Sequence, residues 1–209
     1  REELGSLAGK QVLVVCGTGN NGGDGLVAGR HLAGLGASVS CALLGRTGEL
    51  KPDPRANAEL LFQAGITIKE VSSIDELASL LRAQDIIIDA LFGTGLTRAP
   101  VRLYADAIHL INDSKACVVA VDIPSGVDSD TGFVHEPAVR AQLTVTMGLP
   151  KSGLYLYPGR NCVGKLRIAD IGYPRQLLDD GGATFLADDD YVRGHLPQRP
   201  AQGHKGTFG

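Results

Sequence analysis

The residues best suited to chemistry stand at the ends of hydrophobic segments. Asp89 ends the segment 86–89 and Asp122 ends the segment 116–122, and both segments have the composition of buried strands. A carboxylate in a partly buried crevice can have a raised pKa and serve as an acid or a base. In a second interpretation, each aspartate only accepts hydrogen bonds from the loop that follows it. We therefore treat Asp122 as a candidate acid–base residue.

A cation site is a further interpretation of Asp89. Its carboxylate, with the amide of Asn21 and the hydroxyl of Ser125, offers hard oxygen donors that suit an alkali cation or a hydrated Mg²⁺. These residues lack the nitrogen and sulfur donors that zinc prefers. Ser125 is not expected to be a nucleophile, because the surrounding segment 123–127 lacks the first glycine of the G-x-S-x-G motif.

Lys151 lies in the segment Gly148-Leu-Pro-Lys151-Ser-Gly153, which follows another apolar run. Most lysines are solvated surface charges, and this remains one interpretation of the residue. If Lys151 lies in a ligand crevice, its ammonium group can bind phosphate or sit beside Asp122.

A glycine-rich loop at 17–25 contains five glycines in nine positions and joins a predicted strand to a predicted helix. This arrangement aims backbone N–H groups at a ligand. The loop fits G-x-G-x-x-G, yet no acid ends the second predicted strand at 38–44, where a dinucleotide-binding protein would hold the ribose. Asp24, expected in the first helical turn, would also oppose a pyrophosphate. An ordinary NAD-dependent oxidoreductase is therefore disfavoured.

Alternating strands and helices must position these groups. The apolar patterns predict strands at 10–17, 38–44, 66–71, 85–92, 116–122, 143–147 and 165–169, and helices at 22–35, 54–64, 73–83 and 98–112. This order predicts an α/β fold, a three-layer αβα Rossmann-like sandwich with a mostly parallel, doubly wound sheet. The first strand should be central and the third, which alternates, near an edge. Because strand carboxyl ends line the ligand crevice of such a sheet, the loops 17–25, 89–99, 122–128 and 147–153 should meet there.

Composition and charge exclude several classes of partner and location. The 209 residues carry a net charge of −3, and no run of Lys or Arg exceeds two, so neither nucleic acid nor a membrane surface is an expected partner. No apolar stretch reaches the length of a membrane span. The four cysteines are widely separated, without C-x-x-C, which is typical of free thiols in a reducing compartment. We expect a cytoplasmic protein.

Four motifs occur in order, each at the end of a predicted strand. They are Asn20-Asn21-Gly-Gly-Asp24-Gly25, Asp89-Ala-Leu-Phe-Gly-Thr-Gly95, Val121-Asp-Ile-Pro-Ser-Gly126 and Thr144-Val-Thr-Met-Gly-Leu-Pro-Lys151-Ser-Gly-Leu154. Together, over about residues 10–172, they resemble the YjeF N-terminal domain family, the NAD(P)H-hydrate epimerases. The resemblance implies an isomerase that interconverts the R and S forms of NADHX and NADPHX, which carry a hydroxyl at C6 of a reduced nicotinamide ring.

The resemblance also implies roles for single residues. The implied substrate-binding positions are Asn20, Asn21, Gly22, Gly23, Asp24, Gly93, Thr94, Gly95, Leu96, Thr97, Arg98, Ala99 and Asp122. Asn21, Asp89 and Ser125 would bind K⁺, and family habit implies a homodimer. Our hypothesis for catalysis makes Asp122 the acid–base residue, with Lys151 assisting electrostatically. The alternative is a non-catalytic relative that binds only a nucleotide or a protein partner.

Two regions of the chain are expected to differ in role. Residues 1–195 should form the epimerase domain, with the helices that usually precede its first strand missing. Residues 196–209 should be a linker and the start of a truncated ribokinase-like dehydratase, because His204-Lys205-Gly206 resembles the entry into that domain of bifunctional members. That domain is a lyase that uses ADP or ATP. The acidic segment 188–190 is expected to be surface or linker-like.

Overall fold

The computed structural model describes residues 3–174, 176, 184–196, 202–204 and 206. The chain forms two compact units, Arg1–Ile171 and Gly172–Gly209. Most of the segment 196–209, in which a second domain was expected to begin, lies outside the described residues.

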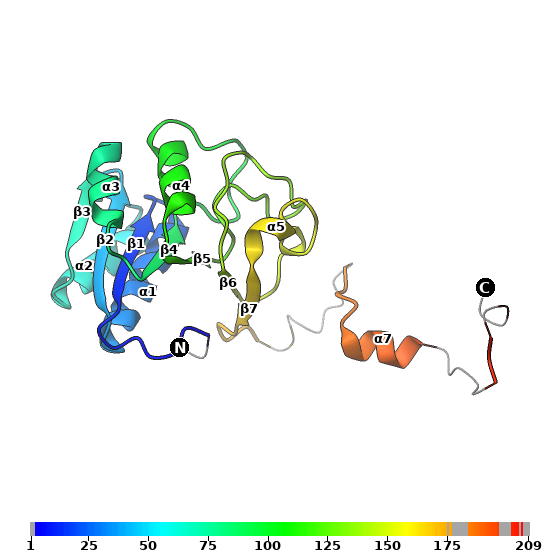
Figure 1. Ribbon diagram of the computed structural model, residues 1–209. Helices are drawn as coiled ribbons and strands as arrows, with labels where there is room; N and C mark the ends of the chain where they lie inside the picture. Colours follow the sequence, from blue (N-terminus) through cyan, green and yellow to red (C-terminus); the bar gives the residue numbers. More distant parts are fainter. Residues whose placement is uncertain (1–2, 175, 177–183, 197–201, 205, 207–209) are drawn as a thin grey trace. The chain divides into compact units, whose positions relative to one another are not determined.

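One parallel sheet organises the first unit (Figure 1). In the described residues it has seven strands in the order β3-β2-β1-β4-β5-β6-β7. Every neighbouring pair is parallel. The strands are β1 (Gln11–Cys16), β2 (Ser38–Leu44), β3 (Ile68–Val71), β4 (Ile86–Ala90), β5 (Cys117–Val121), β6 (Leu143–Met147) and β7 (Lys165–Ala169). The predicted α/β fold is confirmed, with β1 inside the sheet and β3 at an edge.

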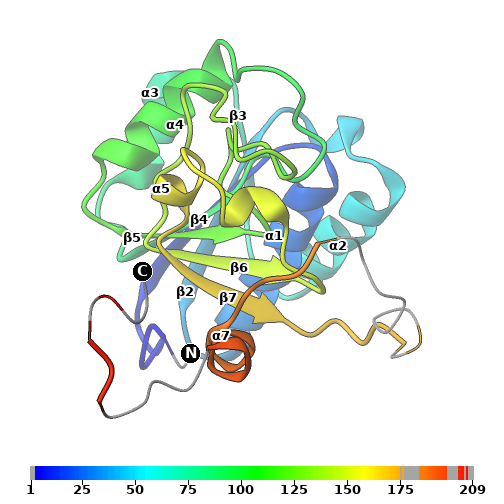
Figure 2. The same ribbon diagram turned by 90° about the vertical axis from the view of Figure 1, so that its right-hand side faces the viewer.

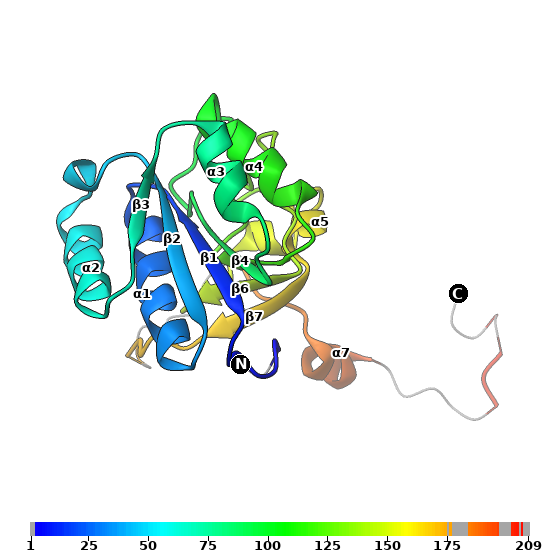
Figure 3. The same cartoon turned by 60° about the vertical axis from the view of Figure 1, so that its left-hand side comes forward.

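Helices cover both faces of the sheet. Figures 2 and 3 show α1 (Asn20–Gly34) and α2 (Pro52–Gln63) on one face, and α3 (Ile74–Leu81) and α4 (Leu103–Asp113) on the other. Successive side chains of a strand point to opposite faces, so β1 supplies both cores. Val12 and Val14 share a buried cluster with Leu26 of α1. Leu13 shares the opposite cluster with Ile108 of α4. The three predicted layers follow from this division.

Local sequence signals place several helix ends. Ser73 caps α3 by accepting a bond from the N–H of Glu76 at 3.4 Å, and the Glu76 carboxylate accepts from the N–H of Ser73 at 3.3 Å. This reciprocal capping box satisfies N–H groups that the first turn leaves unpaired. Pro52 stands at the start of α2, where its missing N–H is no loss. Gly36 follows α1 with a φ of +91°, a backbone that favours glycine.

Some predicted boundaries were wrong. Helix α1 begins at Asn20 instead of 22, so Asp24 lies in the second turn and not in the first. Helix α4 begins at Leu103, and the residues from 98 to 102 form an extended or turned loop. Cys162 lies in the short helix α5 (Arg160–Val163), just before β7. The four cysteine thiols are free, as the sequence predicts.

The acidic segment 188–190, expected to be surface or linker-like, is exposed and forms the start of a helix. Helix α7 (Asp189–His195) begins there because Asp188 accepts a bond from the N–H of Tyr191 at 2.8 Å. Acidic side chains in a first turn also interact favourably with the helix dipole. Among the helices of the described residues, none is both long and apolar enough to cross a membrane.

Candidate functional site

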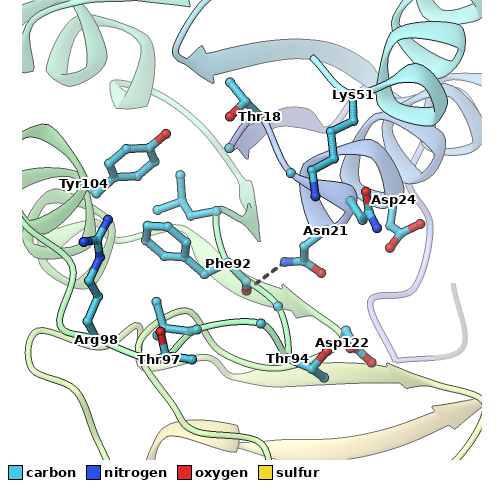
Figure 4. Close-up of a pocket in the computed structure, with 17 residues that line it drawn as sticks. Thr18, Asn21, Asp24, Lys51, Phe92, Thr94, Thr97, Arg98, Tyr104 and Asp122 are labelled. Atoms are coloured by element: carbon cyan, nitrogen blue, oxygen red, sulfur yellow. Dashed lines mark hydrogen bonds between the residues drawn. The ribbon is translucent and has the colours of Figure 1, made fainter. Parts of the chain in front are cut away.

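A cavity of about 710 Å³ opens at the carboxyl ends of the central strands (Figure 4). Its wall comes from the loops after β1, β2, β4 and β5, where the strand order reverses between β1 and β4. A crevice at this kind of switch point is the usual ligand site of an open α/β sheet. The loops that the sequence predicts to meet do so because β1, β4, β5 and β6 are consecutive neighbours in the sheet.

Most of the expected substrate-binding residues contribute to this wall. Those that line the cavity are Asn20, Asn21, Asp24, Gly93, Thr94, Gly95, Leu96, Thr97, Arg98 and Asp122. Gly22 and Gly23 are instead buried in α1, and Ala99 lies outside the lining. The structure therefore brings together side chains from segments about 100 residues apart in the sequence.

Asp122 and Lys151 form an ion pair beside the cavity. The Lys151 Nζ atom lies 2.5 Å from Asp122 Oδ1, and the two side chains are 21% and 14% exposed. The same oxygen accepts bonds from the Thr146 hydroxyl and the Met147 N–H, both at 3.1 Å. Lys151 also donates to the Met147 carbonyl at 2.9 Å. These contacts hold the carboxylate by Oδ1 and leave Oδ2 as the atom available to a ligand.

The backbone of Asp122 is unusual. Its φ is +67°, in the left-handed region that few residues other than glycine adopt. Aspartate and asparagine tolerate this region better than other side chains. The turn ends β5 while the Asp122 N–H still donates to the Val145 carbonyl of β6 at 2.8 Å.

Asp89 and Ser125 form a buried cluster behind the cavity wall. Both residues are fully buried. The Asp89 carboxylate accepts from the Ser125 hydroxyl at 2.6 Å and from the Ser125 N–H at 2.8 Å. The Phe92 N–H donates to the Ser125 hydroxyl at 2.9 Å, and the Asn21 amide nitrogen donates to the Phe92 carbonyl at 2.9 Å. The three residues expected to hold a cation are thus linked through the backbone of Phe92.

Burial perturbs the ionisation of two carboxylates here. Desolvation raises the pKa of Asp89 from 3.8 to about 6, against the opposing effect of its hydrogen bonds from Ser125. Desolvation and, second, the negative charge of Asp122 raise the pKa of Asp24. Neither aspartate forms an ion pair within the described residues. Carboxylates of this kind, near a cavity, are typical of functional sites.

Glycines set the close approach of the loop 17–25 to its neighbours. A Cβ atom on Gly22 would lie 1.9 Å from the carbonyl oxygen of Gly17, and one on Gly17 would lie 2.4 Å from that of Leu91. Both contacts are with backbone atoms, which cannot move aside as the end of a flexible side chain can. The glycine-rich loop is therefore needed for packing the cavity wall as well as for contact with a ligand.

Sequence reasoning missed several wall residues, of which Lys51 and Tyr104 are the most polar. Lys51 precedes α2 in the loop after β2, and Figure 4 shows its side chain reaching into the cavity. Because that loop leaves the carboxyl end of a central strand, the crevice rule could have identified Lys51. Tyr104, from α4, donates to the Leu44 carbonyl at 2.7 Å. Nothing local marks Tyr104, because its contact depends on how α4 lies on the sheet.

Fold and site together define an α/β protein with a ligand cavity at the strand carboxyl ends and an aspartate–lysine pair beside it. Comparison of sequences identifies the family. The chain belongs to the YjeF-related protein N-terminus family, whose sequence profile matches residues 1–153.

Curated relatives include both long and short proteins. The chain is 40% identical to a protein of Moorella thermoacetica and 44% identical to one of Thermofilum pendens, both named bifunctional NAD(P)H-hydrate repair enzyme Nnr. These matches cover 100% and 94% of this chain but only 40% and 37% of those relatives. A Rhodopirellula baltica protein named NAD(P)H-hydrate epimerase is 39% identical, over 80% of this chain and 68% of its own length.

A solved structure shares the fold. The crystal structure of the yeast protein ynu0 matches with a TM-score of 0.72 over 91% of this chain and 79% of that chain. Sequence identity is 22%, so this likeness concerns the fold alone.

Proposed function

We propose that the chain is an NAD(P)H-hydrate epimerase, which interconverts the R and S forms of NADHX and NADPHX. Its relatives named epimerase or bifunctional repair enzyme support the substrate class. The observation that carries the proposal is the Asp122–Lys151 ion pair, which places a proton-transfer group at the edge of a cavity of about 710 Å³.

The proposed reaction is loss and return of water at C6. The Asp122–Lys151 pair gives a proton to the hydroxyl as the C6–O bond breaks, and the electron pair leaves on the oxygen of water. The lone pair of the ring nitrogen then forms a C=N bond to C6, giving an iminium. Water adds to the opposite face, the π electrons return to nitrogen, the added water loses a proton to solvent, and solvent returns a proton to the Asp122–Lys151 pair. The product is the other epimer, with no net gain or loss of atoms.

The chain stabilises the cationic intermediate through groups already oriented in the free protein. Asp24 and Asp122 supply carboxylates to the wall, and the amides of Asn20 and Asn21 add dipoles. Fixed groups of this kind need no reorganisation when charge develops, which is why they lower barriers effectively. We propose that the residues expected from the resemblance bind the substrate here, with Gly22, Gly23 and Ala99 shaping the loops.

We also propose that K⁺ binds to Asn21, Asp89 and Ser125. Their donor set fits, because it consists of oxygens and includes a fully buried carboxylate that no cationic side chain of the described residues neutralises. A bound cation would supply that missing positive charge. In the described part of the chain, no three His, Cys, Asp or Glu side chains gather, so a site rich in such ligands has no support.

The test is to follow the R/S ratio of NADHX by chromatography. The wild-type protein should accelerate equilibration of a pure epimer above the spontaneous rate. Asp122→Asn should lower turnover by about 10²-fold or more, the usual loss when general acid–base catalysis is removed. Asn tolerates the left-handed backbone, so the fold should persist. Asp113→Asn, an exposed residue at the end of α4, is the matched control. Near-normal turnover in Asp122→Asn would exclude the assigned role.

Three broader features complete the proposal. The chain corresponds to the N-terminal part of the bifunctional relatives, with residues 1–195 as the epimerase domain and 196–209 leading toward a dehydratase domain. The family resemblance favours a homodimer, which light scattering would test. Four free cysteines favour a reducing, cytoplasmic location, which tagging in cells would test.

A further inference from the structure

Asp24 is a half-buried acid that the mechanism above uses only as a fixed charge. Its side chain comes from the second turn of α1, while that of Asp122 comes from the end of β5. Figure 4 shows both carboxylates at the same end of the cavity, approaching it from different elements.

The two aspartates have opposite electrostatic surroundings. Asp122 lies 2.5 Å from the Lys151 ammonium, which balances its charge. Asp24 has no cationic partner within the described residues, and it faces the charge of Asp122. Both desolvation and that charge raise the pKa of Asp24, which favours its neutral, proton-bearing form. Two carboxyl groups with opposed environments are a recurring basis for separate acid and base roles.

Epimerisation at C6 places a geometric demand on the site. Water must leave from one face of the ring and add to the other, and a carboxylate fixed on one side can reach only one face. A single acid–base residue would therefore leave proton transfer on the other face to solvent, or require the substrate to turn over inside the cavity. A second proton-transfer group on the other side removes this requirement.

We propose that Asp24 is this second acid–base residue, acting on the face of the ring opposite to Asp122; the inference rests on the proposed epimerase function. For one epimer, Asp24 gives its proton to the leaving hydroxyl, and the C6–O electron pair departs with water. Water then adds to the iminium from the other face and passes a proton to the Asp122–Lys151 pair. For the other epimer, the Asp122–Lys151 pair is the acid and Asp24 is the base. After each turnover, proton exchange with solvent returns Asp24 and the pair to their starting protonation states.

Exchange of the C6 oxygen with ¹⁸O-labelled water separates this mechanism from a one-residue mechanism. Each pure epimer of NADHX is incubated with protein in labelled water, and both ¹⁸O incorporation and inversion are measured above the spontaneous rate. Asp24→Asn should lower inversion by about 10²-fold. It should still catalyse ¹⁸O exchange without inversion in one epimer, because the Asp122 face remains intact. Asp122→Asn should show the same behaviour with the other epimer.

The controls make each outcome decisive. Retained exchange in one epimer shows that Asp24→Asn is folded and binds substrate, which a merely structural loss would not show. Inversion by Asp24→Asn at near wild-type rate overturns the inference while the epimerase function stands. Loss of exchange for both epimers in Asp24→Asn also overturns it. If the wild-type protein neither inverts nor exchanges NADHX, the proposed function fails, and this inference fails with it.

Discussion

Replacement of Asp89 by Asn should remove a specific pH dependence of stability. The pKa of Asp89 is about 6 in the folded chain, whereas an ordinary aspartate, as in the unfolded chain, has a pKa of 3.8. Between these values the folded chain holds a proton that the unfolded chain has released. The stabilising contribution is therefore complete below about pH 4 and is lost as the pH rises through about 6.

The size of this effect follows from the same shift. A difference of about 2 pKa units, at about 1.4 kcal/mol each, corresponds to about 3 kcal/mol. Asn is a suitable replacement, because its amide can keep two bonds to Ser125 if the Ser125 hydroxyl rotates to accept. The measured quantity is the difference in the free energy of unfolding between wild type and Asp89→Asn. The change of this difference with pH matters, and its size at any single pH does not.

The assay is urea unfolding of both proteins from about pH 4 to about pH 7.5, with choline as the only added cation. The stability of Asp89→Asn relative to wild type should rise by about 3 kcal/mol across this range. At about pH 7.5, replacing choline by K⁺ should raise the stability of the wild-type protein and leave that of Asp89→Asn unchanged, because a ligand that binds the native state stabilises it. Parallel stability curves for the two proteins in choline would refute the reasoning.

Two further predictions concern the cavity wall. Gly22→Ala should destabilise the fold by about 1–3 kcal/mol in thermal or urea unfolding, because its Cβ would lie 1.9 Å from a backbone oxygen. Gly34→Ala, in the same helix but with open space around its Cβ position, should be neutral or stabilising, and equal losses in both variants would contradict the packing argument. Lys51→Met should raise the KM for NADHX by up to about fivefold with little change in kcat, since an exposed charge pair contributes about 1 kcal/mol or less. An unchanged KM would show that Lys51 does not contribute to substrate binding.

The sequence predicts the centre of the sheet well because the central strands are buried on both faces. A central parallel strand such as β1 is apolar at nearly every position, and its run ends sharply in glycines. The polar groups after β1, β4 and β5 could be assigned to one crevice without knowing the strand order, because all parallel strands end at the same edge. The pairing of Lys151 with Asp122 was one of two interpretations, and adjacency of β5 and β6 decides it.

Contacts between the helices and the sheet could not be predicted from the sequence. Tyr104 reaches the end of β2 because α4 packs across the sheet, and no periodic pattern encodes that placement. Helix α7 was missed because Asp188–Asp190 has the composition of a loop, although one aspartate serves as the cap and the others occupy the first turn. The start of α1 was misplaced because two asparagines, which favour caps and turns, are its first residues.

The left-handed backbone at Asp122 offers a way to recognise lost chemistry in distant relatives. A φ of +67° there strains most side chains by about 1–3 kcal/mol, and glycine is free of that strain. A descendant that no longer transfers protons gains stability by drifting to glycine at this turn. We therefore expect aspartate at this position in relatives that use the carboxylate, and glycine or asparagine in relatives that do not.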